Sequence, residues 1–234
     1  MKLLTLLVGA SVCVSACSSS TGSSGPDAAT PPQDDGATPV MDEAGPVDEA
    51  SMEAGPPTCV YPSGPYGTGP GNTLGPTLSW QGYAANDPNV STLTLSELFD
   101  CDGSKGIDAI IIDTSAGWCA ACEDQAHDES ELTSQYDQLG IKAITLLIMN
   151  AAEQPATTAD ALAWRMTYNL EDVGIYADPN FLLEPVGQQT IGLPITMIVD
   201  PRTMKVVKET EGYGQMNPPV PDPTAVSLAE KNRQ

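Results

Sequence analysis

Residues 109–122 read Ala-Ile-Ile-Ile-Asp-Thr-Ser-Ala-Gly-Trp-Cys-Ala-Ala-Cys, an apolar run followed by two cysteines that are separated by two residues. A continuous apolar run of this kind is typical of a strand that is buried on both faces of a sheet. Two cysteines at this spacing can close a disulfide within one helical turn. If a helix begins there, its first N–H groups and its dipole favour a thiolate on Cys119. The stretch therefore predicts a strand that delivers a redox-active cysteine pair to a helix N-terminus.

The first residues of the chain have the pattern of an export signal. Lys2 precedes an apolar run over residues 3–14, which is too short to span a bilayer but suits a signal peptide over residues 1–16. The run ends in Val14-Ser15-Ala16-Cys17, which resembles the lipobox of bacterial lipoproteins. That resemblance implies that Cys17 is lipidated, and Ser18 after it favours the outer membrane. An ordinary signal peptide with an incidental cysteine is the alternative.

Residues 17–58 after the signal predict a disordered acidic stalk. This segment consists mainly of Ser, Thr, Gly, Pro, Ala, Asp and Glu, and it lacks Lys, Arg and aromatic residues. Such a composition cannot bury enough apolar surface to offset the entropy of ordering the chain. The whole chain carries a formal charge of -22 and only nine basic residues. Because nucleic-acid binding depends on clusters of Lys and Arg, we expect no nucleic-acid partner, and we expect membrane attachment through the lipid alone.

The remainder is long enough for one domain, which we place at residues 59–216, with a surface tail over 217–234. Apolar runs and helical spacings alternate along it, which predicts an α/β fold with a mixed sheet and helices on its faces. The predicted elements are a hairpin strand at 77–83, strands at 107–114, 141–149 and 173–177, helices from Cys119 to Gly140, at 158–169 and at 180–189, and a hairpin over 195–208.

Four features in this order resemble the thioredoxin fold of secreted or membrane-anchored bacterial redoxins. They are the Trp118-Cys119-x-x-Cys122 motif, Asp113 six residues before Cys119, the loop Gly192-Leu193-Pro194-Ile195-Thr196, and the hairpin with Asp200 at its turn. The resemblance runs from about Leu93 to Tyr213. It implies a central mixed β-sheet flanked by helices, here with an N-terminal extension.

The resemblance also implies a role for each of these residues. Cys119 is the exposed nucleophile, and Cys122 is the resolving thiol that releases the mixed disulfide. Asp113 is a buried proton acceptor that helps to deprotonate Cys122 through a water. Pro194 follows a cis peptide bond and places the preceding backbone for pairing with a substrate chain. Trp118 shields the disulfide and shapes the contact surface, although a simple packing role remains open.

The active-site motif departs from many relatives in its charge. Ala121 stands where many of them have proline, and Glu123 and Asp124 follow the second cysteine without a nearby basic residue. Carboxylates close to a thiolate disfavour it and raise its pKa. We therefore expect a weaker thiolate and a more reducing couple than in strongly oxidising envelope enzymes.

Cys59 and Cys101 lie outside this motif. In an oxidising compartment an even leftover pair favours a structural disulfide, which here would tie the N-terminal lead to the loop before the central strand. Two free thiols, or a redox role for Cys101, remain the alternatives. His127, the one histidine, is expected to be exposed.

The favoured function is a lipid-anchored thiol–disulfide oxidoreductase of the bacterial cell envelope, on the periplasmic side. Its partners are expected to be envelope proteins with thiols or disulfides and an unidentified redox partner, and neither a cofactor nor a metal is expected. Two alternatives use the same cysteines. One is a copper-binding module with Cys119 and Cys122 as soft ligands. The other is a peroxiredoxin-like peroxidase, which requires a Thr-x-x-Cys site with a supporting Arg. Here Thr114 lies five residues before Cys119, and the nearest Arg in the sequence is Arg165.

Overall fold

The computed structural model describes residues 59–185, 191–214 and 221–234. The predicted signal peptide, the candidate lipidation site Cys17 and the acidic stalk lie outside these residues. Within them, no helix combines the length and the apolar character that crossing a membrane requires.

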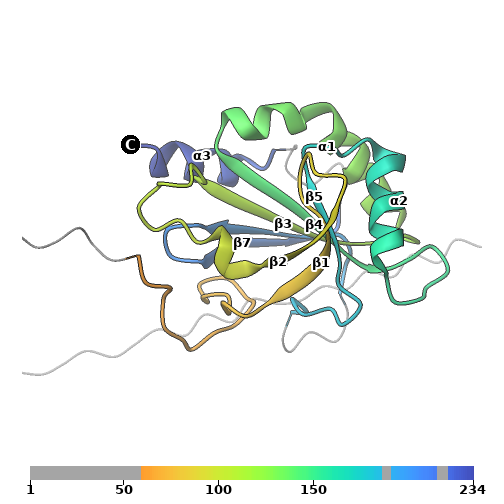
Figure 1. Ribbon diagram of the computed structural model, residues 1–234, viewed down its shortest axis with the longest axis horizontal. Coiled ribbons are helices and arrows are strands. Elements are labelled where there is room, and N and C mark those ends of the chain that lie inside the picture. The colour runs from red at the N-terminus through yellow and green to blue at the C-terminus, as the bar shows by residue number, and fades with distance from the viewer. Residues whose placement is uncertain (1–58, 186–190, 215–220) are drawn as a thin grey trace, which may run out of the picture. The chain divides into compact units, whose positions relative to one another are not determined.

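Among the described residues, one mixed sheet contains the strands β1 (Ser79–Tyr83), β2 (Val90–Thr94), β3 (Ala109–Ala116), β4 (Ile141–Met149), β5 (Gly174–Ala177), β6 (Ile195–Asp200) and β7 (Lys205–Glu211). Their order across the sheet is β2-β1-β5-β4-β3-β6-β7 (Figure 1). The central strands β3, β4 and β5 are parallel, whereas β1, β6 and β7 run antiparallel to their neighbours. β3 is buried along its whole length, as its apolar run predicted. The predicted α/β fold with a central mixed sheet is confirmed.

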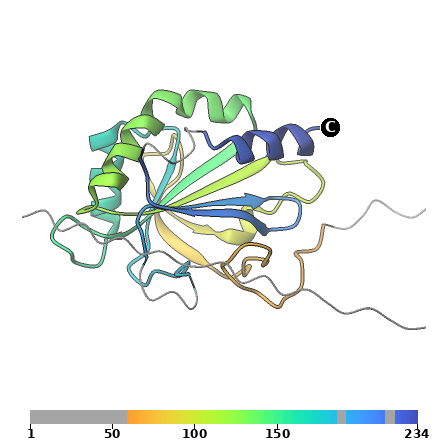
Figure 2. The ribbon, with the colours of Figure 1, turned by 180° about the vertical axis from the view of Figure 1, so that it is seen from behind.

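The helices are α1 (Ala120–Gln138), α2 (Thr158–Tyr168) and α3 (Pro223–Asn232). All three pack on one face of the sheet, as the two opposite views of Figures 1 and 2 show. Alternation along β3 divides the core, since Ala109 and Ile111 contact the helices and Ile110 and Ile112 point to the other face. Asp113 therefore lies on the face that α1 covers.

The other face of the sheet is covered by the N-terminal lead and the short 3-10 helix η1 (Leu95–Leu98). Leu74 from the lead and Leu95 and Leu98 from η1 are buried there. The lead also hydrogen-bonds to β7, where Val206 N donates to Asn72 O at 2.9 Å and Gly71 N donates to Val206 O at 2.7 Å. Because β7 is an edge strand, these contacts cover backbone groups that would otherwise be open to pairing.

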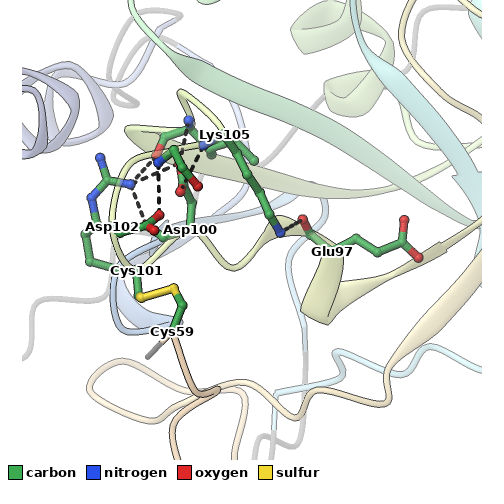
Figure 3. The surroundings of a disulfide bond; sticks show 9 residues. Cys59, Glu97, Asp100, Cys101, Asp102 and Lys105 are labelled. Carbon is green, nitrogen blue, oxygen red and sulfur yellow. Dashed lines mark hydrogen bonds and ion pairs between the residues drawn. A yellow bond between two sulfur atoms is a disulfide. The ribbon is translucent and has the colours of Figure 1, made fainter. Parts of the chain in front are cut away.

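A disulfide between Cys59 and Cys101 joins this lead to the loop before β3, with the two Cα atoms 5.7 Å apart (Figure 3). The loop is itself organised by Asp100, which is 1% exposed and accepts hydrogen bonds from the backbone N–H groups of Lys105 and Ile107. Arg202 pairs with the same carboxylate at 3.2 Å. The N-terminal extension is thus fastened covalently to a rigid loop.

Two predictions about the end of the domain are wrong. The tail expected over 217–234 instead contains α3, whose N-terminus is capped by the Asp222 side chain accepting from Thr224 N at 2.7 Å. Ala225, Leu228 and Ala229 are buried against the sheet, and these mostly small residues gave little apolar signal. The helix expected over 180–189 is also absent from its described part, since residues 180–185 contain only turns and irregular backbone.

Candidate active site

The end of β3 delivers the cysteine pair to α1. The strand ends at Ala116, and Cys119 N donates to Ala116 O at 3.0 Å, so the intervening turn is tight. Gly117 N donates to Met149 O at 2.8 Å. A Cβ on Gly117 would stand 2.7 Å from Ala151 N, so only glycine lets this turn approach the loop after β4 so closely. The turn thus holds the cysteines at the carboxyl edge of the parallel strands.

Cys119 is the N-cap residue of α1, and a disulfide joins it to Cys122 with the Cα atoms 5.2 Å apart. Cys122 N donates to Cys119 Sγ at 3.2 Å. After reduction, the same N–H and the positive end of the helix dipole would favour a thiolate on Cys119.

Cys119 was expected to be exposed, but only 6% of its surface is accessible, because the first turn of α1 and the apolar cluster beneath it cover most of the side chain. Cys122 is 1% exposed. Cys119 is therefore the more exposed residue of a mostly covered pair.

The surface beside the disulfide combines an exposed aromatic ring with acidic side chains. Trp118 is 48% exposed, which is unusual for a tryptophan with a packing role alone. Glu123 in the first turn of α1 is partly exposed, and Asp124 is exposed. Among the described residues, neither of these carboxylates forms an ion pair.

The loop before β6 reaches the same edge of the sheet. The Leu193–Pro194 peptide bond is cis. β6 begins at Ile195, which lies opposite Thr114 near the end of β3. Pro194 is thus placed beside the strand end that leads to Cys119, and its carbonyl oxygen accepts from Gly212 N at 2.7 Å.

A buried polar group lies between β3, β6 and α1. Asp113 is 2% exposed, and its Oδ1 accepts from Gln125 Nε2 at 2.9 Å and from the Thr196 hydroxyl. Burial raises the pKa of Asp113, and its hydrogen bonds with Thr196, Glu129 and Gln125 oppose that rise. Burial and the neighbouring Asp113 raise the pKa of Glu129 well above its ordinary value.

Sequence reasoning singled out Asp113 but missed Gln125 and Glu129. Both lie on the buried stripe of α1, three and seven residues after Cys122. Spacing could have located them, because polar side chains at core positions of a helix are uncommon and need partners.

The remaining candidates lie away from the cysteines or outside the described residues. His127 is exposed, and its ring packs edge-on against Tyr168 with centroids 4.9 Å apart. The described part of the chain contains no group of three or more His, Cys, Asp or Glu that could hold a metal ion. Cys17, the candidate lipidation site, falls outside the described residues.

No protein-family model and no curated protein matches the chain. Solved structures that are similar to it include a secreted thiol-disulfide isomerase from Corynebacterium glutamicum, with 15% identity, coverage of 68% of this chain and 86% of that chain, and a TM-score of 0.48. A putative thiol:disulfide interchange protein DsbE from Chlorobium tepidum has 16% identity, coverage of 70% and 95%, and a TM-score of 0.44. A 2-Cys peroxiredoxin from Plasmodium vivax has 8% identity, coverage of 68% and 79%, and a TM-score of 0.49. These likenesses are too distant to assign an activity, so any function must be argued from the site itself.

Proposed function

We propose that this protein is a thiol–disulfide oxidoreductase that exchanges disulfides with protein substrates through Cys119 and Cys122. One observation carries the proposal: the disulfide closes at the N-terminus of α1, with Cys119 as the N-cap and as the more exposed of the two cysteines. A helix N-terminus stabilises the thiolate that attacks, and the second sulfur within the same turn is placed to resolve the product.

In the reducing direction the Cys119 thiolate attacks one sulfur of a substrate disulfide. A bond forms between Cys119 Sγ and that sulfur, and the other substrate sulfur leaves as a thiolate. The Cys122 thiol then loses its proton to the carboxylate of Asp113, directly or through a water, and attacks Cys119 Sγ. The internal disulfide forms, the second substrate sulfur leaves, and two electrons have passed from the protein to the substrate.

The surroundings of the disulfide supply a place for the substrate chain. The backbone before cis-Pro194 precedes the first residue of β6, where an extended segment can pair with it as a short strand. Trp118 offers an exposed apolar face next to the sulfur. Main-chain pairing recognises a polypeptide without reading its sequence, which suits an enzyme with several protein clients.

The peroxidase alternative needs a cationic side chain at the reactive cysteine, and the position of Arg165 argues against it. Arg165 is buried on α2, where Nη1 donates to the carbonyl oxygens of Ala84 at 3.2 Å and Asp87 at 2.6 Å. Its Nη2 pairs with Glu171 at 2.6 Å. Both Nη groups of Arg165 are therefore taken up by partners other than Cys119.

Reduction of insulin in the presence of dithiothreitol tests the proposed activity. The purified protein should accelerate insulin precipitation, and the Cys119→Ser variant should be inactive, while the Cys59→Ser, Cys101→Ser double variant should keep the activity. A protein that binds Cu(I) tightly through Cys119 and Cys122 but leaves insulin intact would be the copper-binding module instead.

The proposed cellular setting rests on the sequence before the folded domain. A lipid on Cys17 would tether the domain to the envelope through the stalk of residues 18–58, on the periplasmic side and in the outer membrane. Incorporation of labelled palmitate in a bacterial host, and its loss in a Cys17→Ala variant, is the expected result. Release of an unlabelled protein into the periplasm would show an ordinary cleaved signal peptide.

A further inference from the structure

A second buried carboxyl group accompanies Asp113 in the core between α1 and the sheet. Glu129 projects from α1 and is 3% exposed, and its carboxyl group lies near enough to Asp113 for each to shift the pKa of the other. Two carboxylates rarely share a buried site, because each charge loses its hydration and repels the other. A proton must therefore remain on one member of the pair through neutral pH.

The donors around the pair indicate which member keeps its charge. Asp113 Oδ1 accepts from Gln125 and from the Thr196 hydroxyl, and Gln125 Nε2 also lies 3.1 Å from Thr196 Oγ1. Among the described residues, no N–H or hydroxyl donor reaches Asp113 Oδ2. A protonated Glu129 supplies the missing donor. Asp113 then has three donors and remains the carboxylate, and Glu129 is the neutral acid.

The other charged and titratable groups near the pair add no stabilising cation. Asp222 at the N-cap of α3 repels the Asp113 charge, but Asp222 is itself paired with Lys208 on β7 at 2.8 Å. Tyr136 on α1 and Tyr213 after β7 are neutral phenols whose pKa values are raised. In the described part of the chain, neither Asp113 nor Glu129 forms an ion pair with Lys, Arg or His. Hydrogen bonds alone therefore hold the buried charge.

We propose that Glu129 is a positioning residue which stays a neutral carboxylic acid and donates a hydrogen bond to Asp113, so that Asp113 remains an anion able to take the proton of Cys122. A carboxylic acid that is kept neutral by its surroundings can serve as a hydrogen-bond donor at neutral pH. The inference rests on the proposed disulfide exchange, because it assigns a task to Glu129 within that reaction.

The proton balance of the resolving step follows from this assignment. The Cys122 S–H bond breaks and an O–H bond forms on Asp113, while Glu129 keeps its own proton. The Cys122 thiolate attacks Cys119 Sγ, and the substrate sulfur leaves as a thiolate that is protonated by water. The pair then carries two protons, and loss of one to solvent restores its single negative charge.

Two matched variants test the task of Glu129. Glu129→Gln keeps the size and a donor group but has no titratable proton, whereas Glu129→Leu removes the donor. Loss of the donor should raise the pKa of Asp113, so Glu129→Leu should move the pH profile for resolution of a preformed mixed disulfide upward by about one unit. At pH values below the pKa of Asp113, where a shift of one unit changes the charged fraction about tenfold, the variant should resolve the mixed disulfide about tenfold more slowly. Glu129→Gln should restore the rate to within about threefold of the wild-type rate.

The same pair of variants can overturn the proposal. If Glu129→Gln loses as much rate as Glu129→Leu, then a charge at position 129 matters and Glu129 is not a neutral donor. Unchanged kinetics in both variants would equally refute a positioning role. Asp113→Asn should slow resolution whether or not Glu129 is a neutral donor, so this variant tests the role of Asp113 as the base and not the role of Glu129.

A measurement on the unmodified protein separates this inference from the proposed activity. Carboxyl carbon shifts of Glu129, followed by NMR in the oxidised full chain, should show a protonated side chain at pH 7. An ionised Glu129 at pH 7 would refute the inference even if the protein reduces insulin. If Glu129 is protonated but the protein has no exchange activity, the protonation state assigned to the Asp113–Glu129 pair would stand and the proposed function would be refuted.

Discussion

Loss of the Cys59–Cys101 disulfide should destabilise the domain by a predictable amount. The bond joins residues that are 42 positions apart, with a Cα–Cα distance of 5.7 Å. In the chain-entropy model, removing a disulfide that closes a loop of this length lowers the free energy of unfolding by about 4 kcal/mol at 25 °C. Other contacts keep the lead docked, since Tyr61 OH donates to Leu74 O at 2.9 Å and the ring of Tyr61 packs on Phe99 with centroids 5.0 Å apart. The folded state should therefore survive in the Cys59→Ser, Cys101→Ser variant.

Urea unfolding of this double variant, followed by circular dichroism, measures the loss. The Cys119→Ser, Cys122→Ser variant is the matched control, because its disulfide spans only three positions and contributes about 2 kcal/mol or less in the same model. The long-range pair should cost clearly more than the short-range pair. A loss of less than about 1 kcal/mol in the Cys59→Ser, Cys101→Ser protein, or an equal loss in both variants, would refute the view that this bond restrains the unfolded chain.

Three further predictions concern the buried charge, the redox potential and the last helix. Burial raises the pKa of Asp113 in the folded state, so its contribution to stability is present below the pKa of the unfolded chain and is lost as the pH rises through the folded pKa. Asp113→Asn should therefore raise the urea midpoint above that of the wild-type protein at pH 8, and this advantage should disappear near pH 4. The same difference in urea midpoint between variant and wild type at both pH values would contradict the prediction. The reduction potential of the Cys119–Cys122 couple, measured against glutathione, should be lower than about -200 mV, because carboxylates such as Glu123 disfavour the thiolate. Glu123→Lys should raise it, and a wild-type value near -120 mV, typical of strong periplasmic oxidants, would exclude this reasoning. Leu228→Ala should cost about 2–3 kcal/mol in thermal or urea unfolding, because Leu228 is 8% exposed, whereas the 69%-exposed Met166 should tolerate alanine within about 0.5 kcal/mol. Equal effects of these two substitutions would mean that α3 is not packed on the sheet.

The features that sequence alone predicted are those with strong local patterns. The apolar run at 109–112 gave the buried strand β3, and the cysteine spacing placed the start of α1. The glycine at 140 adopts φ of 65°, and it ends that helix as its residue type indicated. The cis bond before Pro194 followed from the resemblance of its loop, since local composition alone does not determine the isomer.

The features that sequence missed depend on tertiary packing. α3 is stabilised by small side chains against the sheet and by Asn232 Nδ2, which donates to Asp108 O at 2.9 Å. Neither contact leaves a periodic apolar pattern in the sequence. Glu129 looked like one more acid in an acidic chain, and only the register of α1 over β3 brings it to Asp113. Placement of a charge inside the core is a property of the fold and not of local sequence.

Capture of a mixed disulfide tests the proposed chemistry most directly. The Cys122→Ser protein is reduced, mixed with a disulfide-bonded protein substrate, quenched with acid and mapped by mass spectrometry. We expect the substrate to be linked to Cys119 in this variant, with none trapped in the Cys119→Ser protein. Linkage to Cys59 or Cys101 would contradict the assignment of Cys119 as the attacking sulfur. So would the absence of any linkage at a protein concentration at which the wild-type protein reduces the same substrate.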